Sequence, residues 1–212
     1  MQLTKFEHAC FMVEQDGKSI IVDPGVWTTD IATPKNVVAI VVTHEHPDHF
    51  DVTALGAIIA HNPEAVIFAH HDITQQLGDT LPHTSVVAGQ TIEAAQFTLE
   101  FFGGDHATIH DSIPSVSNLG VLINNSVYYP GDSFTKPSKP VTMLGLPVSA
   151  PWLKMSEVIE FATSVKASTV FPTHDAILSL NGKALVDRMI TPHVESYGGT
   201  YHRPIGPLKV DA

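Results

Sequence analysis

Cysteine is nearly absent from this sequence: Cys10 is the single example in 212 residues. An intrachain disulfide is therefore excluded, which fits a reducing compartment. The sequence also lacks an apolar run of the roughly 18 residues that a membrane helix requires. Its first residues show no basic segment followed by an apolar stretch and a small-residue cleavage site, as a secretory signal would. These absences predict a cytoplasmic protein without a membrane span.

Positive charge is also scarce, with 11 Lys and Arg against 22 Asp and Glu, and a formal net charge of -11 at pH 7. An acidic surface repels phosphate backbones, so no nucleic-acid partner is expected, although bound divalent cations would reverse the sign locally. The 43% of hydrophobic residues predicts a globular protein with a buried core. The length suits a single domain over residues 1–212, or two small ones. No oligomeric state is predicted.

Short apolar runs separated by turn residues predict an α/β protein. Asp16-Gly17 between two such runs is typical of a hairpin, and VVAIVV at 37–42 reads as a strand buried on both faces. The other predicted strands are 65–69, 97–102, 119–123, 126–129 and 169–172. The predicted helices are 53–61, 72–78, 152–165 and 182–190, and the tail after residue 191 is expected to be mostly irregular.

Metal-type or acidic residues follow five of the predicted strands. In α/β proteins, sites form where loops leave strand ends, so these side chains are expected to converge on one cleft. The residues that follow the strands are Asp23, His44, His106, Asp132 and His174.

The densest of these segments is THEHPDH at residues 43–49. In an extended segment, His44 and His46 point to the same side and can reach one ion. Pro47 then stiffens a turn, so that Asp48 and His49 face another direction and suit a second, neighbouring ion. Nitrogen and oxygen ligands suit zinc, and also iron or manganese. The alternatives are a solvated loop, a satisfied polar cluster, or chance in a chain with 13 His.

The pattern His44-x-His46-x-Asp48-His49 resembles the signature of the metallo-β-lactamase-fold hydrolases. The other parts of the resemblance follow in order over residues 20–175: Asp23 in IIVDPG, His106 in GGDHA, Asp132 in YPGDS and His174 in FPTHD. The stretch from Gly103 to Ile123 is similar to a compact branch of that superfamily. This branch includes the L-ascorbate-6-phosphate lactonase and N-acyl phosphatidylethanolamine phosphodiesterase lineages.

The resemblance implies a four-layer αββα sandwich with a site for two divalent ions, zinc being expected first. It implies that the first ion is bound by His44, His46 and His106, and the second by Asp48, His49 and His174. Asp132 would bridge the two ions, and Asp23 would orient a ligand by hydrogen bonding. His110, four residues after His106, would face the substrate.

These residues lead to the hypothesis of a binuclear hydrolase that acts on a small-molecule ester, lactone or phosphodiester. A hydroxide shared by the ions would attack, Asp48 and Asp132 would orient it and accept its proton, and His110 would protonate the leaving group. The alternative is an iron-dependent enzyme of redox or sulfur chemistry on the same fold. A non-catalytic protein with a vestigial site predicts missing ligands, and none is missing. Antibiotic resistance and RNA processing are not favoured, and a small anionic or neutral metabolite is expected.

Several further residues have two possible roles. His8 and His202 could reach the site or be structural, whereas Cys10 is expected to be a buried small hydrophobe. Trp152 is expected to pack in the core, with pocket lining as the alternative, and Phe134 to shape the pocket. The segments 24–36, 107–117 and 133–150 are expected to wall the pocket. The remaining histidines are expected to be ordinary surface or core polar residues: His61, His70, His71, His83 and His193.

Overall fold

The computed structural model describes residues 1–29, 31 and 34–210. Its strands form two sheets of seven strands each among these residues, in the orders β14-β1-β2-β3-β4-β5-β6 and β13-β12-β11-β10-β9-β8-β7. The first sheet contains β1 (Gln2–Lys5), β2 (Phe11–Gln15), β3 (Lys18–Val22), β4 (Val37–Val42), β5 (Val66–Ala69), β6 (His83–Ser85) and β14 (Leu208–Lys209). The second contains β7 (Thr91–Ala94), β8 (Phe97–Asp105), β9 (Ser117–Ile123), β10 (Val127–Tyr129), β11 (Met143–Pro147), β12 (Thr169–Thr173) and β13 (Thr200–Tyr201).

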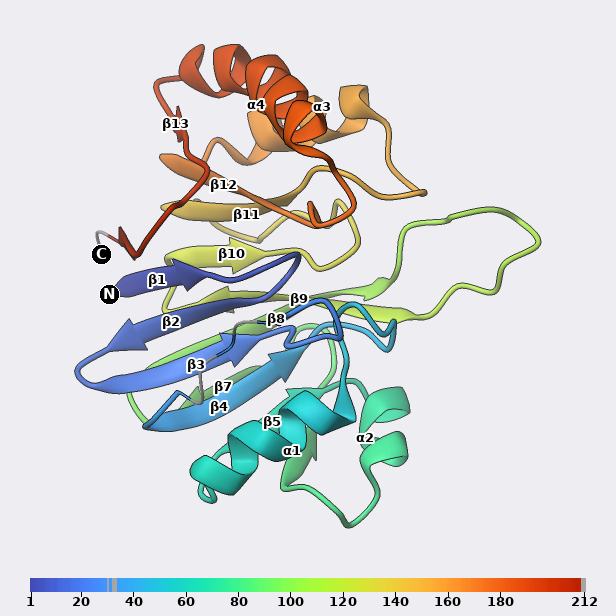
Figure 1. The fold of residues 1–212 in the computed structure, drawn as a ribbon, viewed down its shortest axis with the longest axis vertical. Coiled ribbons are helices and arrows are strands. Elements are labelled where there is room, and N and C mark those ends of the chain that lie inside the picture. Colours follow the sequence, from blue (N-terminus) through green and yellow to red (C-terminus); the bar gives the residue numbers. More distant parts are fainter. Residues whose placement is uncertain (30, 32–33, 211–212) are drawn as a thin grey trace.

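Four helices of the described residues cover the outer faces of the two sheets (Figure 1). They are α1 (Val52–His61), α2 (His71–Leu77), α3 (Met155–Val165) and α4 (Leu180–Glu195). One apolar core lies between the sheets and includes Phe11, Phe101 and Phe171. A second joins the first sheet to α1 and α2, and a third joins the second sheet to α3 and α4. The predicted αββα sandwich is therefore confirmed.

The local sequence explains the elements that position the site. The β2–β3 hairpin turns at Asp16 and Gly17, whose φ angles of 49° and 72° fit the type I′ geometry that matches strand twist. β4 pairs in parallel with both β3 and β5, and this central position explains its unbroken apolar sequence. Asp51 caps α1 by accepting a 2.9 Å hydrogen bond from the Thr53 amide.

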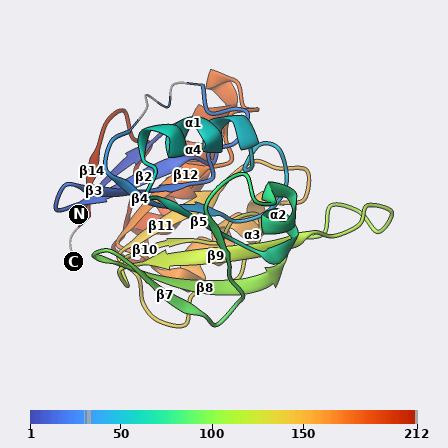
Figure 2. The ribbon, with the colours of Figure 1, turned by 90° about the horizontal axis from the view of Figure 1, so that it is seen from below.

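Strands β3 and β4 run parallel to each other, and β10 to β12 do the same in the second sheet. Their carboxyl ends lie at one edge of the sandwich, opposite the two chain termini (Figure 1). The long loop between β8 and β9 projects from the same edge, as the perpendicular view in Figure 2 also shows. Among the described residues, no helix combines the length and the apolarity needed to cross a bilayer.

Several elements of the fold differ from the sequence-based expectation, and two of the differences lie in the C-terminal half of the chain. The tail after residue 191 is not wholly irregular, because α4 continues through Pro192 to Glu195 and two short strands follow. Buried Ile190 and Val194 pack that helix onto the third core, which outweighs the helix-breaking tendency of proline. The sequence pattern also does not predict β11. In this strand, Gly145 has no side chain, so the rings of Tyr129 and Phe171 can lie within about 3 Å of where its Cβ atom would be.

Candidate metal centre

Asp23 fixes the segment that follows β4. Its carboxylate accepts hydrogen bonds from the Thr43 amide at 2.8 Å, the Thr43 hydroxyl at 2.7 Å and His49 Nδ1 at 2.7 Å. Asp23 is fully buried and has a φ of 48°, a region that non-glycine residues adopt where the surrounding structure holds them. Because His49 donates through Nδ1, the lone pair lies on its Nε2, which is 3.4 Å from Asp132 Oδ1. The orienting role predicted for Asp23 has this geometric basis.

Gly25 brings the strand end and the histidine segment together. A Cβ atom at this position would lie 2.1 Å from the backbone carbon and oxygen of Asp48 and 2.5 Å from the His49 nitrogen. Glycine therefore allows the loop after β3 to pack directly against the backbone that carries two of the predicted ligands.

A first group of three histidines comes together as predicted. The nitrogens of His44, His46 and His106 lie within 4.8 Å of one another, although they come from both sheets. His44 Nε2 lies 3.1 Å from His46 Nδ1, and the His46 and His106 rings are 4.7 Å apart. His106 Nδ1 donates to the Ala107 carbonyl at 2.6 Å, which leaves Nε2 as the atom that faces the other histidines.

A second group contains Asp48, His49 and His174, and also His8. His174 Nδ1 donates to the Ser149 carbonyl at 2.5 Å, and its Nε2 lies 3.3 Å from Asp48 Oδ2. His8 Nδ1 accepts the Ala176 amide at 3.3 Å, so His8 Nε2 carries the proton and donates to Asp48 Oδ2 at 2.9 Å. His8 therefore orients Asp48, and its own lone pair is not directed at the cavity.

Asp132 lies between the two groups. Its Oδ2 atom is 3.3 Å from His106 Nε2 and 3.0 Å from His174 Nε2, and its Oδ1 atom is 3.4 Å from His49 Nε2. The Trp152 indole donates a 2.9 Å hydrogen bond to Oδ2. This central place is the one expected of a bridging carboxylate. The indole contact is a role that sequence reasoning missed.

Burial and opposite charge both shape the electrostatics of these side chains. Burial lowers the pKa of His44 well below its usual range. Burial alone would also lower the pKa of His174, but the Asp132 carboxylate outweighs it and raises that pKa to about 10. Burial likewise opposes ionisation of Asp132, yet His49 and His174 hold the pKa of this carboxyl well below its usual range. Without metal, His174 and Asp132 therefore form a buried ion pair.

Seven buried side-chain oxygen or nitrogen atoms lack a hydrogen-bond partner among the described residues, and three of the seven belong to this cluster: His49 Nε2, His106 Nε2 and Asp132 Oδ1. Buried polar atoms are normally hydrogen-bonded, so three unpartnered atoms within one cluster call for a ligand. All three belong to residues predicted to bind metal. Their nitrogen and carboxylate donors fit a divalent transition metal, zinc included.

The cluster opens into a cavity of about 230 Å³ whose remaining wall is apolar. The expected wall segments contribute Trp27 from 24–36 and Ile109 from 107–117. Residues 133–150 contribute no lining side chain, whereas Pro151 and Trp152 directly after them do. Phe134 acts indirectly, because its ring packs 5.2 Å from that of Trp152.

Neither His110 nor His202 belongs to a group of possible ligands found in the described part of the chain. His110 is exposed in the projecting loop and its ring contacts the Ser112 hydroxyl at 2.8 Å. His202 is exposed beside β13. The sequence carries no local signal that separates these two histidines from His8, because the difference depends on which loops pack together.

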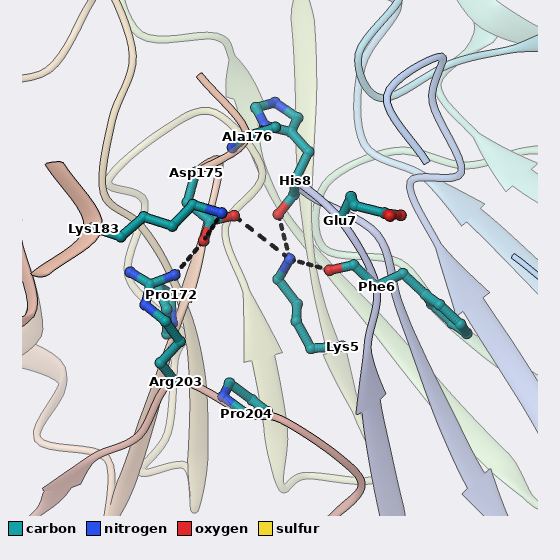
Figure 3. Close-up of a pocket in the computed structure, with 10 residues that line it drawn as sticks. All are labelled: Lys5, Phe6, Glu7, His8, Pro172, Asp175, Ala176, Lys183, Arg203 and Pro204. Atoms are coloured by element: carbon teal, nitrogen blue, oxygen red, sulfur yellow. Dashed lines mark hydrogen bonds and ion pairs between the residues drawn. The ribbon is translucent and has the colours of Figure 1, made fainter. Parts of the chain in front are cut away.

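A second cavity of about 220 Å³ is lined by His8 together with Lys5, Asp175 and Arg203, among others (Figure 3). The Lys5 ammonium donates to the carbonyls of Phe6 and His8, both at 2.6 Å, and lies 3.8 Å from Asp175. Arg203 pairs with Asp175 as well. Figure 3 shows the His8 ring pointing away from the ammonium. This network fixes the backbone beside His8 and His174.

The comparisons with known proteins agree with this geometry. Residues 2–174 match the family model described as "Beta-lactamase superfamily domain". Protein Rv0786c of Mycobacterium tuberculosis is 34% identical over 190 residues, which cover 87% of this chain and 89% of that protein. A protein of Saccharolobus solfataricus named as a UPF0173 metal-dependent hydrolase is 27% identical over 62% of this chain and 61% of its own length. Igni18, described as a metallo hydrolase from Ignicoccus hospitalis, has a similar fold, with a TM-score of 0.74, 21% identity and 98% of each chain covered.

The fold and the site thus define a metal-dependent hydrolase of the metallo-β-lactamase superfamily. The chain belongs to the family described as "Beta-lactamase superfamily domain", whose family model matches residues 2–174.

Proposed function

We propose that this protein binds two divalent ions and hydrolyses a small-molecule ester, lactone or phosphodiester. The convergence of the predicted ligands on one cavity, with three buried donor atoms left unpartnered, carries this proposal. His44, His46 and His106 would hold one ion, and Asp48, His49 and His174 the other, with Asp132 between them. Zinc is the first expectation, and manganese or iron would suit the same ligands.

When bound, the ions would supply a nucleophile from water at neutral pH and stabilise charge that develops on the reacting group. The protein's own residues supply orientation and proton transfer. Asp48 faces the cavity with one oxygen held by His8. Asp132 is held by the Trp152 indole. Fixed carboxylates of this kind can accept a proton from the attacking water.

The proton for the leaving group is assigned to solvent. The sequence suggests His110 as the proton donor to the leaving group. However, His110 does not line the cavity, and its ring is hydrogen-bonded within its own exposed loop. The apolar mouth still admits water, because Asp48 retains 17% of its side-chain exposure.

An iron-dependent enzyme of redox or sulfur chemistry is the alternative that the same ligand types allow. The names of the relatives support the hydrolase instead. Metal identity separates the two functions, because an iron site would be coloured or redox active.

The test is elemental analysis of protein purified without added metal, together with hydrolysis of a generic lactone, carboxylic ester and phosphodiester. We expect about two zinc or manganese ions per chain and activity on at least one substrate class. Asp132→Ala should lower the metal content and abolish hydrolysis, whereas Asp16→Ala, in the exposed β2–β3 turn, should change neither. Full activity of Asp132→Ala, or one iron per chain without hydrolysis, would contradict the proposal.

A further inference from the structure

The wall of the metal cavity that is not made of predicted ligands is entirely apolar. It consists of Trp27, Ile109, Pro151, Trp152 and Ile177. Trp27 and Ile177 keep 41% and 53% of their surface exposed, and both line this one cavity. Such exposure at the mouth of a site marks a surface that an apolar ligand covers.

Two of these wall residues, Trp27 and Trp152, are held in place by contacts with residues of the site. The Trp27 ring packs edge-on against His8 with the centroids 4.6 Å apart, and the Trp152 indole is hydrogen-bonded to Asp132. The apolar surface is therefore positioned by the same residues that orient the two carboxylates. A substrate group that rests on it would be fixed relative to the ions.

Basic side chains are missing from this cavity. All 11 Lys and Arg residues fall in the described part of the chain, and none of them lines it. Lys5, Lys183 and Arg203 are gathered around Asp175 in the neighbouring cavity. Lys154, close to Trp152 in sequence, is 80% exposed at its side chain and pairs with Glu157 at 3.7 Å. A phosphate or carboxylate on the non-reacting part of a substrate would thus meet apolar carbon and no cation.

Without ions, the cavity measures about 230 Å³, and bound ions would take part of that space. A dry apolar cavity of roughly 150 Å³ holds benzene. The cavity therefore suits a group no larger than about one aromatic ring or a short acyl chain.

We infer that the substrate is a carboxylic ester or lactone whose non-reacting part is uncharged and apolar, lying against Trp27 and Ile177. This inference rests on the proposed function and narrows it, since it excludes a phosphate or carboxylate on the non-reacting part of the substrate. In the reaction, the water oxygen bonds to the carbonyl carbon and the acyl carbon–oxygen bond breaks. One water proton reaches the leaving alkoxide oxygen. An ester gives one carboxylic acid and one alcohol, and a lactone opens to one hydroxy acid.

The test uses the zinc-loaded protein and nitrophenyl esters that share one alcohol and differ in the acyl chain. From the acetate to the hexanoate, kcat/KM should rise at least about tenfold, because added methylenes enter an apolar pocket. Ending a chain of similar length in a carboxylate should lower kcat/KM at least about tenfold. Equal or higher kcat/KM for the carboxylate-ended ester would overturn the inference.

Matched variants locate the effect. Ile177→Lys should reverse the preference, so that the carboxylate-ended ester becomes the better substrate while the zinc content stays unchanged. Ile205→Lys adds the same charge at a fully exposed position outside the cavity and should leave the preference unchanged. The same reversal in both variants would show a long-range charge effect and refute the role of the apolar wall.

The proposed function and this inference are overturned by different results. Two bound zinc ions without hydrolysis of any ester, lactone or phosphodiester would overturn both. Hydrolysis of a phosphodiester alone would overturn the inference and leave the proposed function standing. Ester hydrolysis with a preference for charged acyl chains would overturn the inference alone.

Discussion

Replacing Asp23 by Asn is expected to weaken metal binding although Asp23 does not line the cavity. One oxygen must still accept the Thr43 amide, so the new NH₂ group would face His49 Nδ1. Two donors cannot pair, and His49 would move its proton to Nε2. His49 Nε2 is the atom that lacks a hydrogen-bond partner. Once it is protonated, it cannot bind metal.

The magnitude follows from the kind of contact that is lost. A hydrogen bond to a charged group contributes about 1.5–3 kcal/mol, and loss of a partner that orients a metal ligand typically costs about 10–100-fold in affinity. These two scales agree, because a tenfold change corresponds to about 1.4 kcal/mol. We therefore expect a loss of about 10–100-fold at the site that includes His49, and a smaller loss at the other.

The assay is titration of the metal-free protein with zinc in competition with a coloured chelator. Asp16→Asn is the control, because Asp16 lies in the exposed β2–β3 turn at a φ of 49° that Asn tolerates well. Circular dichroism would establish that both variants are folded. Zinc affinity of Asp23→Asn within twofold of the parent at both sites would refute the reasoning about the His49 tautomer.

Three other perturbations test separate parts of the structure. Gly25→Ala should lower the free energy of unfolding in urea by about 1–3 kcal/mol and lower the metal content, because the added Cβ would collide with the Asp48 backbone. An unchanged free energy of unfolding would show that the loop can move to accommodate the Cβ without cost. Since the pKa of His174 is raised to about 10 without metal, zinc uptake should release a proton and tighten about tenfold per unit between pH 7 and 9; calorimetry in buffers of different ionisation enthalpy measures this release. Burial lowers the pKa of Lys5 from 10.5 to about 8, so Lys5 binds more protons in the unfolded chain in that window and its own contribution to stability should rise with pH across it. The stability of the parent relative to Lys5→Met should therefore rise with pH in this window, and a constant difference between the two would contradict the assignment to Lys5.

The sequence predicts those features that depend on local pattern. The hairpin at Asp16-Gly17 and the buried strand before His44 follow from turn chemistry and apolar runs, and both are present. The gathering of His106 and His174 with the 43–49 segment follows from ligand types placed after strands. These expectations needed only residue order, because parallel strands bring their carboxyl ends to one edge.

Contacts made across the sandwich could not be predicted in this way. His8 reaches Asp48 because the loop after β1 packs beside it, and nothing within that loop's own sequence specifies the neighbour. Trp152 looked like a core residue, and it is buried, but its indole also bonds Asp132. His110 has the right spacing from His106 for a site residue, yet the loop carries it outward. Each outcome depends on tertiary packing that a single sequence does not encode locally.

The origin of the ligands in both sheets has a consequence for stability. His44 to His49 follow a strand of the first sheet, whereas His106, Asp132 and His174 follow strands of the second. Ions bound between these two groups of ligands would act as a cross-link between the sheets. Like a disulfide, which this protein does not have, such a cross-link would restrict the unfolded chain over most of its length. Variants that lose metal should therefore also be cleaved more readily by proteases. A single substitution of a metal ligand would then reduce both catalysis and resistance to degradation.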